Sequence, residues 1–322
     1  MLFKNFCLDE RILNVIEKIG YKEPTPIQNM AIPKILEGLD LVATAQTGTG
    51  KTAAFLLPVL HRLAAPYHRQ SKGPRLVVLV PTRELAMQVA TEAKKYSAEL
   101  RGTSIACIYG GVPYDVQRKS LSKNLDILIA TPGRLIDLME QNRVDLSKVE
   151  VFILDEADRM LDMGFIGPVE QIASHMPEIR QTLLFSATID KKILHLSKKL
   201  QKDPIEIRFQ VDQPTSSQIE QKLYYVDGIK HKMRLLDHLL ENTDINQAIV
   251  FTATKRKADE LADHLQTNGY SSGSLHGDMN QRQRTRTIAR LREGKIKFLV
   301  ATDVAARGID VVTLSHVISF DL

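Results

Sequence analysis

The alternation of short apolar runs with longer amphipathic stretches limits this chain to very few folds. Runs such as Arg75–Val80 and Val149–Leu154 are rich in Val, Ile and Leu, whereas stretches such as Glu84–Leu100 and Lys255–Gln266 carry an apolar residue every three or four positions. Apolar strands separated by helices are typical of a parallel sheet that is covered on both faces. Because crossovers between parallel strands are right-handed, the pattern predicts a doubly wound α/β fold.

The same pattern divides the chain into two parts. The predicted strands are Asp40–Ala45, Arg75–Val80, Asp126–Ala130, Val149–Leu154, Gln181–Ser186, Gln221–Val226, Gln247–Phe251, Lys297–Ala301 and His316–Phe320. Residues 203–218 interrupt it with prolines and polar residues, and 322 residues are about twice the usual length of one domain. We expect domain 1 over residues 1–205, a linker over 206–218 and domain 2 over 219–322. The last predicted strand stops at the end of the chain, so we expect a fragment whose second domain is incomplete.

Composition narrows the classes of function. The chain has 43 Lys and Arg against 38 Asp and Glu, a formal net charge of +5, which permits a polyanionic partner without requiring one. Its two cysteines are too few for a disulfide framework or a metal-ligand cluster and suit a reducing cytosol. The longest apolar runs are too short to cross a bilayer, and no apolar signal segment is visible. We therefore expect a cytoplasmic protein that does not bind a membrane.

Ala45–Thr52, AQTGTGKT, predicts a phosphate-binding loop. It follows an apolar stretch and opens the helical run Thr52–Leu63, which is the context that a P-loop requires. Glycines allow a sharp turn that points backbone N–H groups inward, the lysine can reach the β- and γ-phosphates, and the last threonine can bind Mg²⁺. The strict pattern has glycine at the first position, and the alternative is a glycine turn that caps a helix. The candidate nucleotide-binding residues are Ala45, Gln46, Thr47, Gly48, Thr49, Gly50, Lys51 and Thr52.

The acidic segment Asp155–Asp158, DEAD, follows the apolar strand VEVFIL. Ligands of parallel α/β sheets bind at the carboxyl ends of strands, so the position is suited to nucleotide chemistry. We expect Asp155 to hold Mg²⁺ and Glu156 to orient or deprotonate the attacking water. Together with Lys51 they are the candidate catalytic residues. Taken alone, the segment could instead be an acidic helix start that complements the helix dipole.

The order of the motifs resembles that of the DEAD-box ATP-dependent RNA helicases, over essentially the whole chain. The matching segments are YKEPTPIQ (Tyr21–Gln28), AQTGTGKT, PTRELA (Pro81–Ala86), GG (Gly110–Gly111), TPGR (Thr131–Arg134), DEAD, SAT (Ser186–Thr188), IVF (Ile249–Phe251), HGDMNQRQR (His276–Arg284) and ATDVAARGID (Ala301–Asp310). Stretches such as ILDEADRMLDMGF resemble bacterial members. The resemblance implies two RecA-like domains that use ATP and Mg²⁺.

The resemblance also implies contacts to the nucleoside. The amide of Gln28 can pair with the adenine edge, and the ring of Tyr21 can stack on the base. Asp310 would reach the ribose from the second domain. For Tyr21 the alternative stays open that it closes the apolar side of the helix over residues 12 to 19.

The resemblance also implies a set of residues that hold the sugar-phosphate backbone of RNA without reading its sequence. Residues at strand ends and helix starts expose N–H groups that can hold phosphate oxygens. The implied set is Thr82, Arg83, Gly111, Thr131, Gly133 and Arg134 in the first domain, and Thr254, Gln281, Arg284 and Thr302 in the second. For any one of them, plain helix capping is the alternative. Ser186 and Thr188 would couple the sites by bonding to the DEAD carboxylates, unless they merely cap the helix that begins near Asp190.

We therefore expect a helicase that couples ATP binding and hydrolysis to local RNA unwinding or ribonucleoprotein remodelling. The alternatives are an ATP-gated RNA clamp and a DNA-directed helicase. We expect a monomer, with ribosome assembly or RNA decay as family-level guesses for its pathway. Family members carry an HRxGRxxR-type segment that these 322 residues do not contain. Because such arginines contact the γ-phosphate, we expect this chain alone to hydrolyse ATP slowly.

Overall fold

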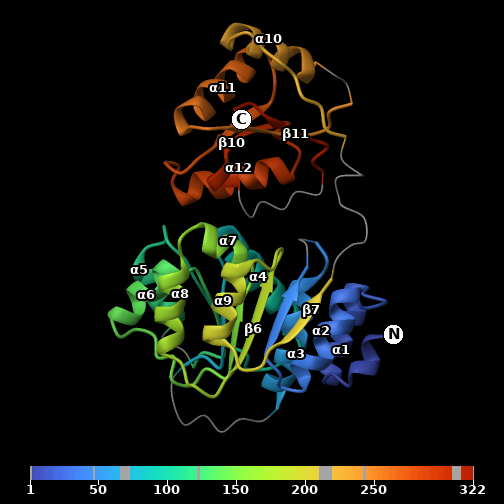
Figure 1. Ribbon diagram of the computed structural model, residues 1–322, viewed down its shortest axis with the longest axis vertical. Coiled ribbons are helices and arrows are strands. Elements are labelled where there is room, and N and C mark those ends of the chain that lie inside the picture. The colour runs from blue at the N-terminus through green and yellow to red at the C-terminus, as the bar shows by residue number, and fades with distance from the viewer. Residues whose placement is uncertain are drawn as a thin grey trace. The chain divides into compact units, whose positions relative to one another are not determined.

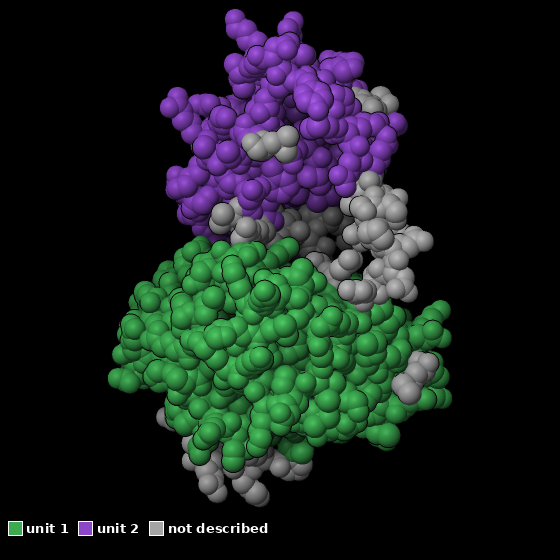
Figure 2. All heavy atoms as spheres, in the orientation of Figure 1, with its two compact units in different colours: residues 1–212 green, residues 213–322 purple. Residues whose placement is uncertain are grey.

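The computed structural model describes residues 2–45, 48–65, 73–121, 124–209, 220–241, 244–306 and 313–321. They form two compact units, which Figure 2 distinguishes by colour: unit 1 is Met1–Asp212 and unit 2 is Gln213–Leu322. In each unit, helices cover both faces of a parallel β-sheet (Figure 1). The predicted fold class, with two doubly wound α/β domains, is confirmed.

Unit 1 contains a seven-stranded parallel sheet in the order β3-β4-β2-β5-β6-β1-β7. Its strands are β1 Leu41–Thr44, β2 Leu76–Leu79, β3 Ile105–Ile108, β4 Ile127–Ala130, β5 Val151–Leu154, β6 Gln181–Ser186 and β7 Ile205–Arg208. The five central strands are buried along their whole length. This burial explains why their sequences are apolar at almost every position instead of alternating.

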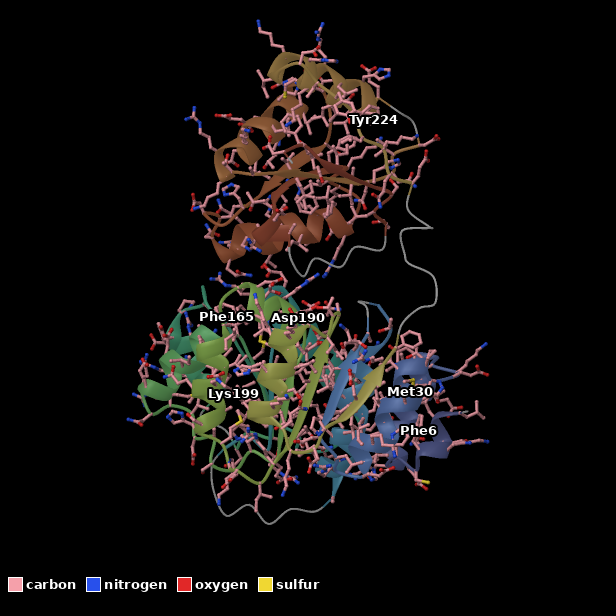
Figure 3. All side chains as sticks on the ribbon, viewed as in Figure 1. Phe6, Met30, Phe165, Asp190, Lys199 and Tyr224 are labelled. Carbon is pink, nitrogen blue, oxygen red and sulfur yellow. The ribbon has the colours of Figure 1, made fainter. Side chains whose placement is uncertain are left out.

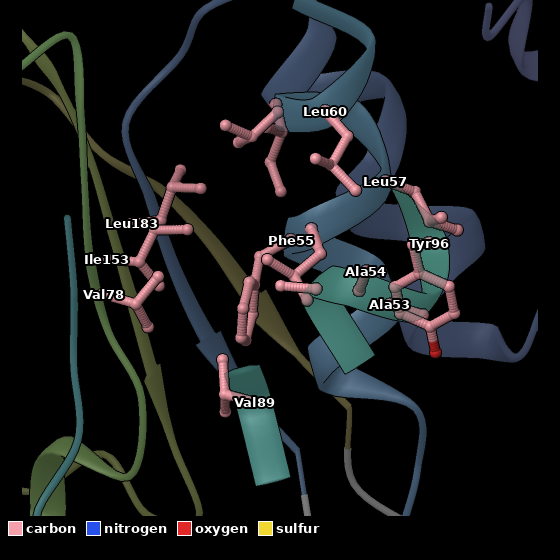
Figure 4. Close-up of a cluster of buried hydrophobic side chains, with 14 of the residues drawn as sticks. Ala53, Ala54, Phe55, Leu57, Leu60, Val78, Val89, Tyr96, Ile153 and Leu183 are labelled. Carbon is pink, nitrogen blue, oxygen red and sulfur yellow. The ribbon is translucent and has the colours of Figure 1, made fainter. Parts of the chain in front are cut away.

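The helices of unit 1 form one layer on each face of this sheet. They are η1 Phe3–Phe6, α1 Glu10–Ile19, α2 Pro26–Leu36, α3 Lys51–Ala64, α4 Arg83–Tyr96, α5 Tyr114–Leu121, α6 Pro132–Glu140, α7 Ala157–Asp162, α8 Ile166–Ser174 and α9 Lys191–Leu200. Helices α1 to α4 share one hydrophobic core with the sheet, and α6 to α9 share the other. Successive side chains of a strand point to opposite faces, so Leu183 of β6 enters the first core and Leu184 the second. Figure 4 shows Phe55 of α3 beside Leu183 in the first core.

Unit 2 contains a four-stranded parallel sheet in the order β11-β8-β10-β9. Its elements are α10 Ile229–Leu240, β8 Ala248–Thr252, α11 Lys255–Thr267, β9 Ser272–Leu275, α12 Gln281–Arg292, β10 Phe298–Thr302, α13 Asp303–Ala306 and β11 His316–Ser319. Helices α10 and α11 pack on one face of the sheet, and α12 packs on the other. The described part of this sheet is therefore smaller than that of unit 1, as its shorter sequence predicts.

Two expectations about the middle of the chain differ from the structure. The expected linker over residues 206–218 overlaps β7, in which Ile205–Arg208 pairs in parallel with β1. The expected strand Gln221–Val226 is wrong, because residues 220 to 226 lie outside any strand. Within that segment Leu223 is 65% exposed and Tyr225 is 87% exposed, so its apolar side chains do not face a core of unit 2.

Strands β3 and β9 were not predicted from the sequence. Ile105–Ile108 contains Ala and Cys, and Ser272–Leu275 contains two serines and a glycine, so neither is the β-branched run that identifies a strand. Both are edge strands, each hydrogen-bonded to one neighbour in its sheet. Tertiary pairing, not local propensity, makes these segments extended.

Within the described ranges, no helix combines the length and the apolar character that a membrane span requires.

The two cysteines lie in different surroundings. Cys7 is exposed, whereas Cys107 lies in β3, where burial raises the pKa of its thiol to about 12. Because the thiolate is the reactive form, we predict that a thiol reagent at pH 8 modifies Cys7 at least ~100-fold faster than Cys107 in the folded protein. Peptide mass spectrometry of the modified protein measures both rates. A Cys7→Ser variant should lose the fast phase, and equal rates at the two thiols would contradict this burial.

Candidate nucleotide and RNA-backbone site

Three neighbouring strands of unit 1 end at the predicted nucleotide motifs. β6 pairs with both β1 and β5, with Thr44 opposite Ser186 and Leu154 opposite Leu184. The chain leaves β1 into the phosphate loop, β5 into DEAD and β6 into SAT, and Ala45 N donates to Ser186 O at 3.0 Å. Since the carboxyl ends of parallel strands lie at one edge of a sheet, the pairing gathers all three motifs there.

The phosphate loop has the backbone that its glycines permit. Gly48 and Gly50 have φ angles of +83° and +88°, in the left-handed region that favours glycine, and α3 begins at the next residue, Lys51. The first N–H groups of α3 therefore point toward the loop, as in an anion site at a helix N-terminus. Lys51 is buried, Thr52 is half-buried, and Gln46 and Thr47 lie outside the described residues.

Gln28 contacts the phosphate loop directly. Its side chain is 3% exposed, its Nε2 donates to Gly50 O at 3.1 Å, and its Oε1 accepts from Thr25 N at 2.9 Å. A Cβ atom at Gly50 would collide with the Gln28 amide. The amide thus links the start of α2 to the loop, a role that the sequence did not suggest. Its contact with adenine remains a prediction.

Tyr21 packs among aromatic side chains. Its ring stacks on Phe3 with centroids 6.3 Å apart, and its hydroxyl lies 3.2 Å from that of Tyr96. The ring is nevertheless 37% exposed. Both partners lie outside α1, in η1 and α4, and the exposed surface leaves room for the predicted stacking on a base.

Two buried carboxyl groups follow β5. Asp155 is 2% exposed and Glu156 is 6% exposed, and burial raises the pKa of both carboxyls. Opposing charges limit this rise: Lys51 acts on Asp155, and Arg159, whose Nη1 donates to Glu156 Oε2 at 3.0 Å, acts on Glu156. Glu156 also has a φ of +55°, a left-handed conformation that is uncommon outside glycine and is often found at functional sites.

The acidic pair is suited to a magnesium ion that is held mainly by phosphates. Among the described residues, no group of three or more His, Cys, Asp or Glu side chains is placed to hold a metal by itself. Mg²⁺ commonly uses one or two protein oxygens together with substrate phosphates. Asp155 Oδ1 accepts from Glu156 N at 3.0 Å, and the carboxyl lies near Lys51. The chemistry of Asp155 and Thr52 therefore fits the predicted ion.

The SAT segment bonds to the last carboxylate of DEAD. Asp158 Oδ2 accepts from Ala187 N at 3.1 Å and from Thr188 Oγ1 at 3.5 Å, while Ser186 Oγ accepts from Thr188 N at 3.4 Å. The alternative that SAT caps the next helix is wrong. Asp190, at the start of α9 in Figure 3, caps it by accepting from Ile193 N at 2.8 Å. Asp158 was absent from the candidate residues, although it forms the bond that joins the two motifs.

Further motifs follow β2, β3 and β4 at the same edge of the sheet. Thr82 caps α4 by accepting from Leu85 N at 3.3 Å, and Thr131 and Gly133 lie at the start of α6. Gly111 has a φ of +87°, and a Cβ atom there would collide with the guanidinium of Arg83. The structure thus brings the unit 1 residues of the predicted RNA grip to neighbouring strand ends.

Arg134, which the resemblance implied as a contact to the RNA backbone, is largely buried in the structure. Its side chain is only 9% exposed. Its Nη1 donates to Val112 O at 2.8 Å and to Gln117 Oε1 at 2.9 Å, and its guanidinium lies 4.1 Å from the centroid of the Tyr114 ring. The guanidinium therefore holds the segment after β3, and its contact with RNA remains a prediction.

The predicted RNA residues of unit 2 also follow strand ends. Thr254 follows β8 and caps α11, accepting from Lys257 N at 3.3 Å; Gln281 is the first residue of α12; and Thr302 ends β10. Arg284 is 9% exposed, and its Nη2 donates to Ala305 O at 3.1 Å. Asp310 lies outside the described residues. The capping bond of Thr254 agrees with the alternative of plain helix capping. The backbone N–H groups at the start of α11 are then the feature suited to a phosphate.

Two family models match the chain: DEAD/DEAH box helicase over residues 25–196, and Helicase conserved C-terminal domain over residues 231–322. Among curated proteins, ATP-dependent RNA helicase DeaD of Escherichia coli (strain K12) is 44% identical over 320 residues, covering 99% of this chain and 50% of DeaD. DeaD of Mycobacterium tuberculosis is also 44% identical, with 99% and 56% covered. The chain thus spans about half the length of the curated relatives it matches.

Solved structures agree with these matches. Saccharomyces cerevisiae Dbp5 bound to RNA and ADP BeF3 has a TM-score of 0.83 and 30% identity, with 100% of this chain and 81% of that chain covered. A DEAD box protein from the hyperthermophile Methanococcus jannaschii has a TM-score of 0.60 and 40% identity, with 100% and 85% covered.

We predict that Gly50→Ala weakens binding of a fluorescent ATP analogue at least ~10-fold, because a side chain there is strained by the left-handed backbone and displaces Gln28. Gly167→Ala in α8 is the matched control, since a Cβ atom there meets nothing within 4 Å. Titration monitored by fluorescence gives both dissociation constants. Unchanged affinity in Gly50→Ala would show that the loop does not contact the nucleotide.

Proposed function

The chain belongs to the DEAD-box helicase family, and from this premise we propose that it is an ATP-dependent RNA helicase. Its ATP-binding part is unit 1, and it couples nucleotide binding and hydrolysis to local unwinding of RNA or remodelling of ribonucleoproteins. The observation that carries the proposal is the assembly of the phosphate loop, DEAD and SAT at the ends of β1, β5 and β6.

Each residue of this assembly has a chemical role in the proposal. Lys51 and the first N–H groups of α3 bind the phosphates, and Thr52 and Asp155 hold Mg²⁺, which supplies positive charge at the transferring phosphoryl group. Glu156 orients the attacking water and accepts its proton. The ion pair with Arg159 supports this role, because a nearby cation favours the ionised carboxylate against the effect of burial.

RNA is proposed to bind through its sugar-phosphate backbone. The candidate residues follow strand ends and start helices, where backbone N–H groups and hydroxyls are suited to phosphate oxygens and carry no information about the base. The bonds from Thr188 and Ala187 to Asp158 support a link between the nucleotide site and this backbone grip. A ligand shifts such a coupled protein only by its difference in affinity for the two states.

The clamp without productive unwinding and the DNA-directed helicase are the rival activities. We also propose a monomeric state, a cytoplasmic location, and ribosome assembly or RNA decay as the pathway. Because the 322 residues contain no HRxGRxxR-type segment, we propose that they hydrolyse ATP slowly by themselves.

We predict slow phosphate release that single-stranded RNA stimulates at least ~5-fold and matched DNA does not, because only RNA offers the 2′-hydroxyls. Phosphate release is measured with RNA, with DNA and without nucleic acid. Lys51→Ala should abolish it, whereas Lys148→Ala, an exposed lysine in the loop before β5, should not.

A duplex-release assay with the same variants separates the rivals. ATP-dependent loss of a short labelled strand supports unwinding, and ATP-dependent RNA binding without strand loss supports the clamp. Equal stimulation by DNA would identify a DNA-directed motor. Absence of both ATP and RNA binding would contradict the proposed function altogether.

A further inference from the structure

Gln117 of α5 is a buried polar residue that belongs to none of the matched motifs. Its side chain is 3% exposed, in a helix whose other side chains are largely accessible to solvent. We propose that Gln117 is a positioning residue for RNA binding, which fixes the Arg134 guanidinium and the turn over residues 110–112 in the arrangement that receives a backbone phosphate. The inference rests on the proposed RNA-binding function of unit 1.

Both ends of the Gln117 amide are hydrogen-bonded. Nε2 donates to Tyr109 O at 2.8 Å, and Oε1 accepts from Arg134 Nη1 at 2.9 Å. Tyr109 directly follows β3, and Arg134 lies in the first turn of α6, after β4. One side chain therefore joins the segment after β3 to the segment after β4, the places that carry the GG and TPGR motifs.

The same contacts fix the orientation of the Arg134 guanidinium. Nη1 also donates to Val112 O at 2.8 Å, so its two hydrogens are both engaged. The Tyr114 ring covers the guanidinium, and Tyr114 Oη donates to Asp137 Oδ2 at 3.0 Å, an oxygen that lies 3.8 Å from Arg134 Nε. Within the described part of the chain, Nε is buried without a hydrogen-bond partner and Nη2 donates to no protein acceptor, so we take Nη2 as the nitrogen that meets a phosphate.

A guanidinium that is already fixed binds a phosphate more favourably than a mobile one. An arginine side chain that must be ordered on binding loses rotamer freedom, and that loss weakens the complex. The Val112 bond also holds the turn next to Gly111, whose φ of +87° and contact with Arg83 admit only glycine. Gln117 is therefore proposed to fix the positions of both Arg134 and the turn over residues 110–112. The opposite possibility is that these contacts sequester Arg134 from RNA.

The test compares two buried glutamines of unit 1. Gln181 is 5% exposed; its Nε2 donates to Ile35 O at 3.1 Å and Leu39 O at 2.6 Å, and its Oε1 accepts from Arg62 Nη2 at 2.9 Å. It begins β6, at the edge of the sheet opposite to the motifs. Gln117→Met removes two side-chain hydrogen bonds and Gln181→Met removes three, but only Gln117 is proposed to serve RNA binding.

The dissociation constant of a fluorescent oligoribonucleotide is measured by anisotropy over a series of KCl concentrations. We predict that Gln117→Met raises the dissociation constant at least ~10-fold. It should also lower the slope of log Kd against log [KCl] by about 0.7, the value for one lost phosphate contact on a single strand. Gln181→Met should change neither quantity. The affinity for an ATP analogue should stay within about twofold of wild type in both variants, which also reports that unit 1 is folded.

A double-mutant cycle tests whether Gln117 acts through Arg134. In an Arg134→Met background, Gln117→Met should lower the salt slope no further. Tyr114→Ala, at a position that is 36% exposed, is the second variant should Gln117→Met fail to fold, and it should weaken RNA binding in the same direction.

Unchanged or tighter RNA binding by Gln117→Met, or an equal loss in Gln181→Met, would overturn the inference. If the proposed RNA-binding function itself is wrong, the wild-type chain does not bind the oligoribonucleotide. That result differs from a failure of the inference about Gln117, in which the wild-type chain still binds.

Discussion

The parallel pairing of β6 with β1 and β5 is the constraint on which the nucleotide site depends. Because these strands run in one direction and in fixed register, the residues that follow Thr44, Leu154 and Ser186 meet at one edge of the sheet. The strands are held there by burial on both faces, under α1 to α4 and under α6 to α9. A one-residue slip would exchange the two faces of a strand and move its motif, so the apolar cores fix the chemistry.

This arrangement buries charged side chains, which add little to the stability of the free protein. Lys51, Asp155 and Glu156 are all buried, and burial raises the pKa of both carboxyls. Burying ionised groups is costly unless they are paired. Lys51 and Arg159 offset part of that cost. A magnesium triphosphate would supply the complementary charges, so the same residues that destabilise the free protein are suited to binding its ligand.

The sequence predicted those parts of the fold and site that depend on local pattern. The central strands are apolar at most positions, so their locations and their parallel arrangement could be predicted, and with them the edge of the sheet at which the motifs lie. Strands β3 and β9 lack that signal, and Gln221–Val226 has it without forming a strand. The bond of Thr188 to a DEAD carboxylate was predicted, but two other side-chain contacts of the site were missed: Gln28 with Gly50, and Gln117 with Arg134. These pairs depend on how helices pack on the sheet, and spacing in the chain carries no record of that.

Calorimetric titration of the chain with ATP tests the central claim most directly. Wild-type protein is predicted to bind one ATP in the presence of Mg²⁺ and to lose at least ~10-fold in affinity when the metal is chelated, because Asp155 and Thr52 hold the ion against the phosphates. Asp155→Asn should bind ATP with the weaker affinity whether or not Mg²⁺ is present. ATP binding by the wild-type protein that is indifferent to Mg²⁺, or no binding at all, would contradict the claim that the ends of β1 and β5 form one nucleotide site.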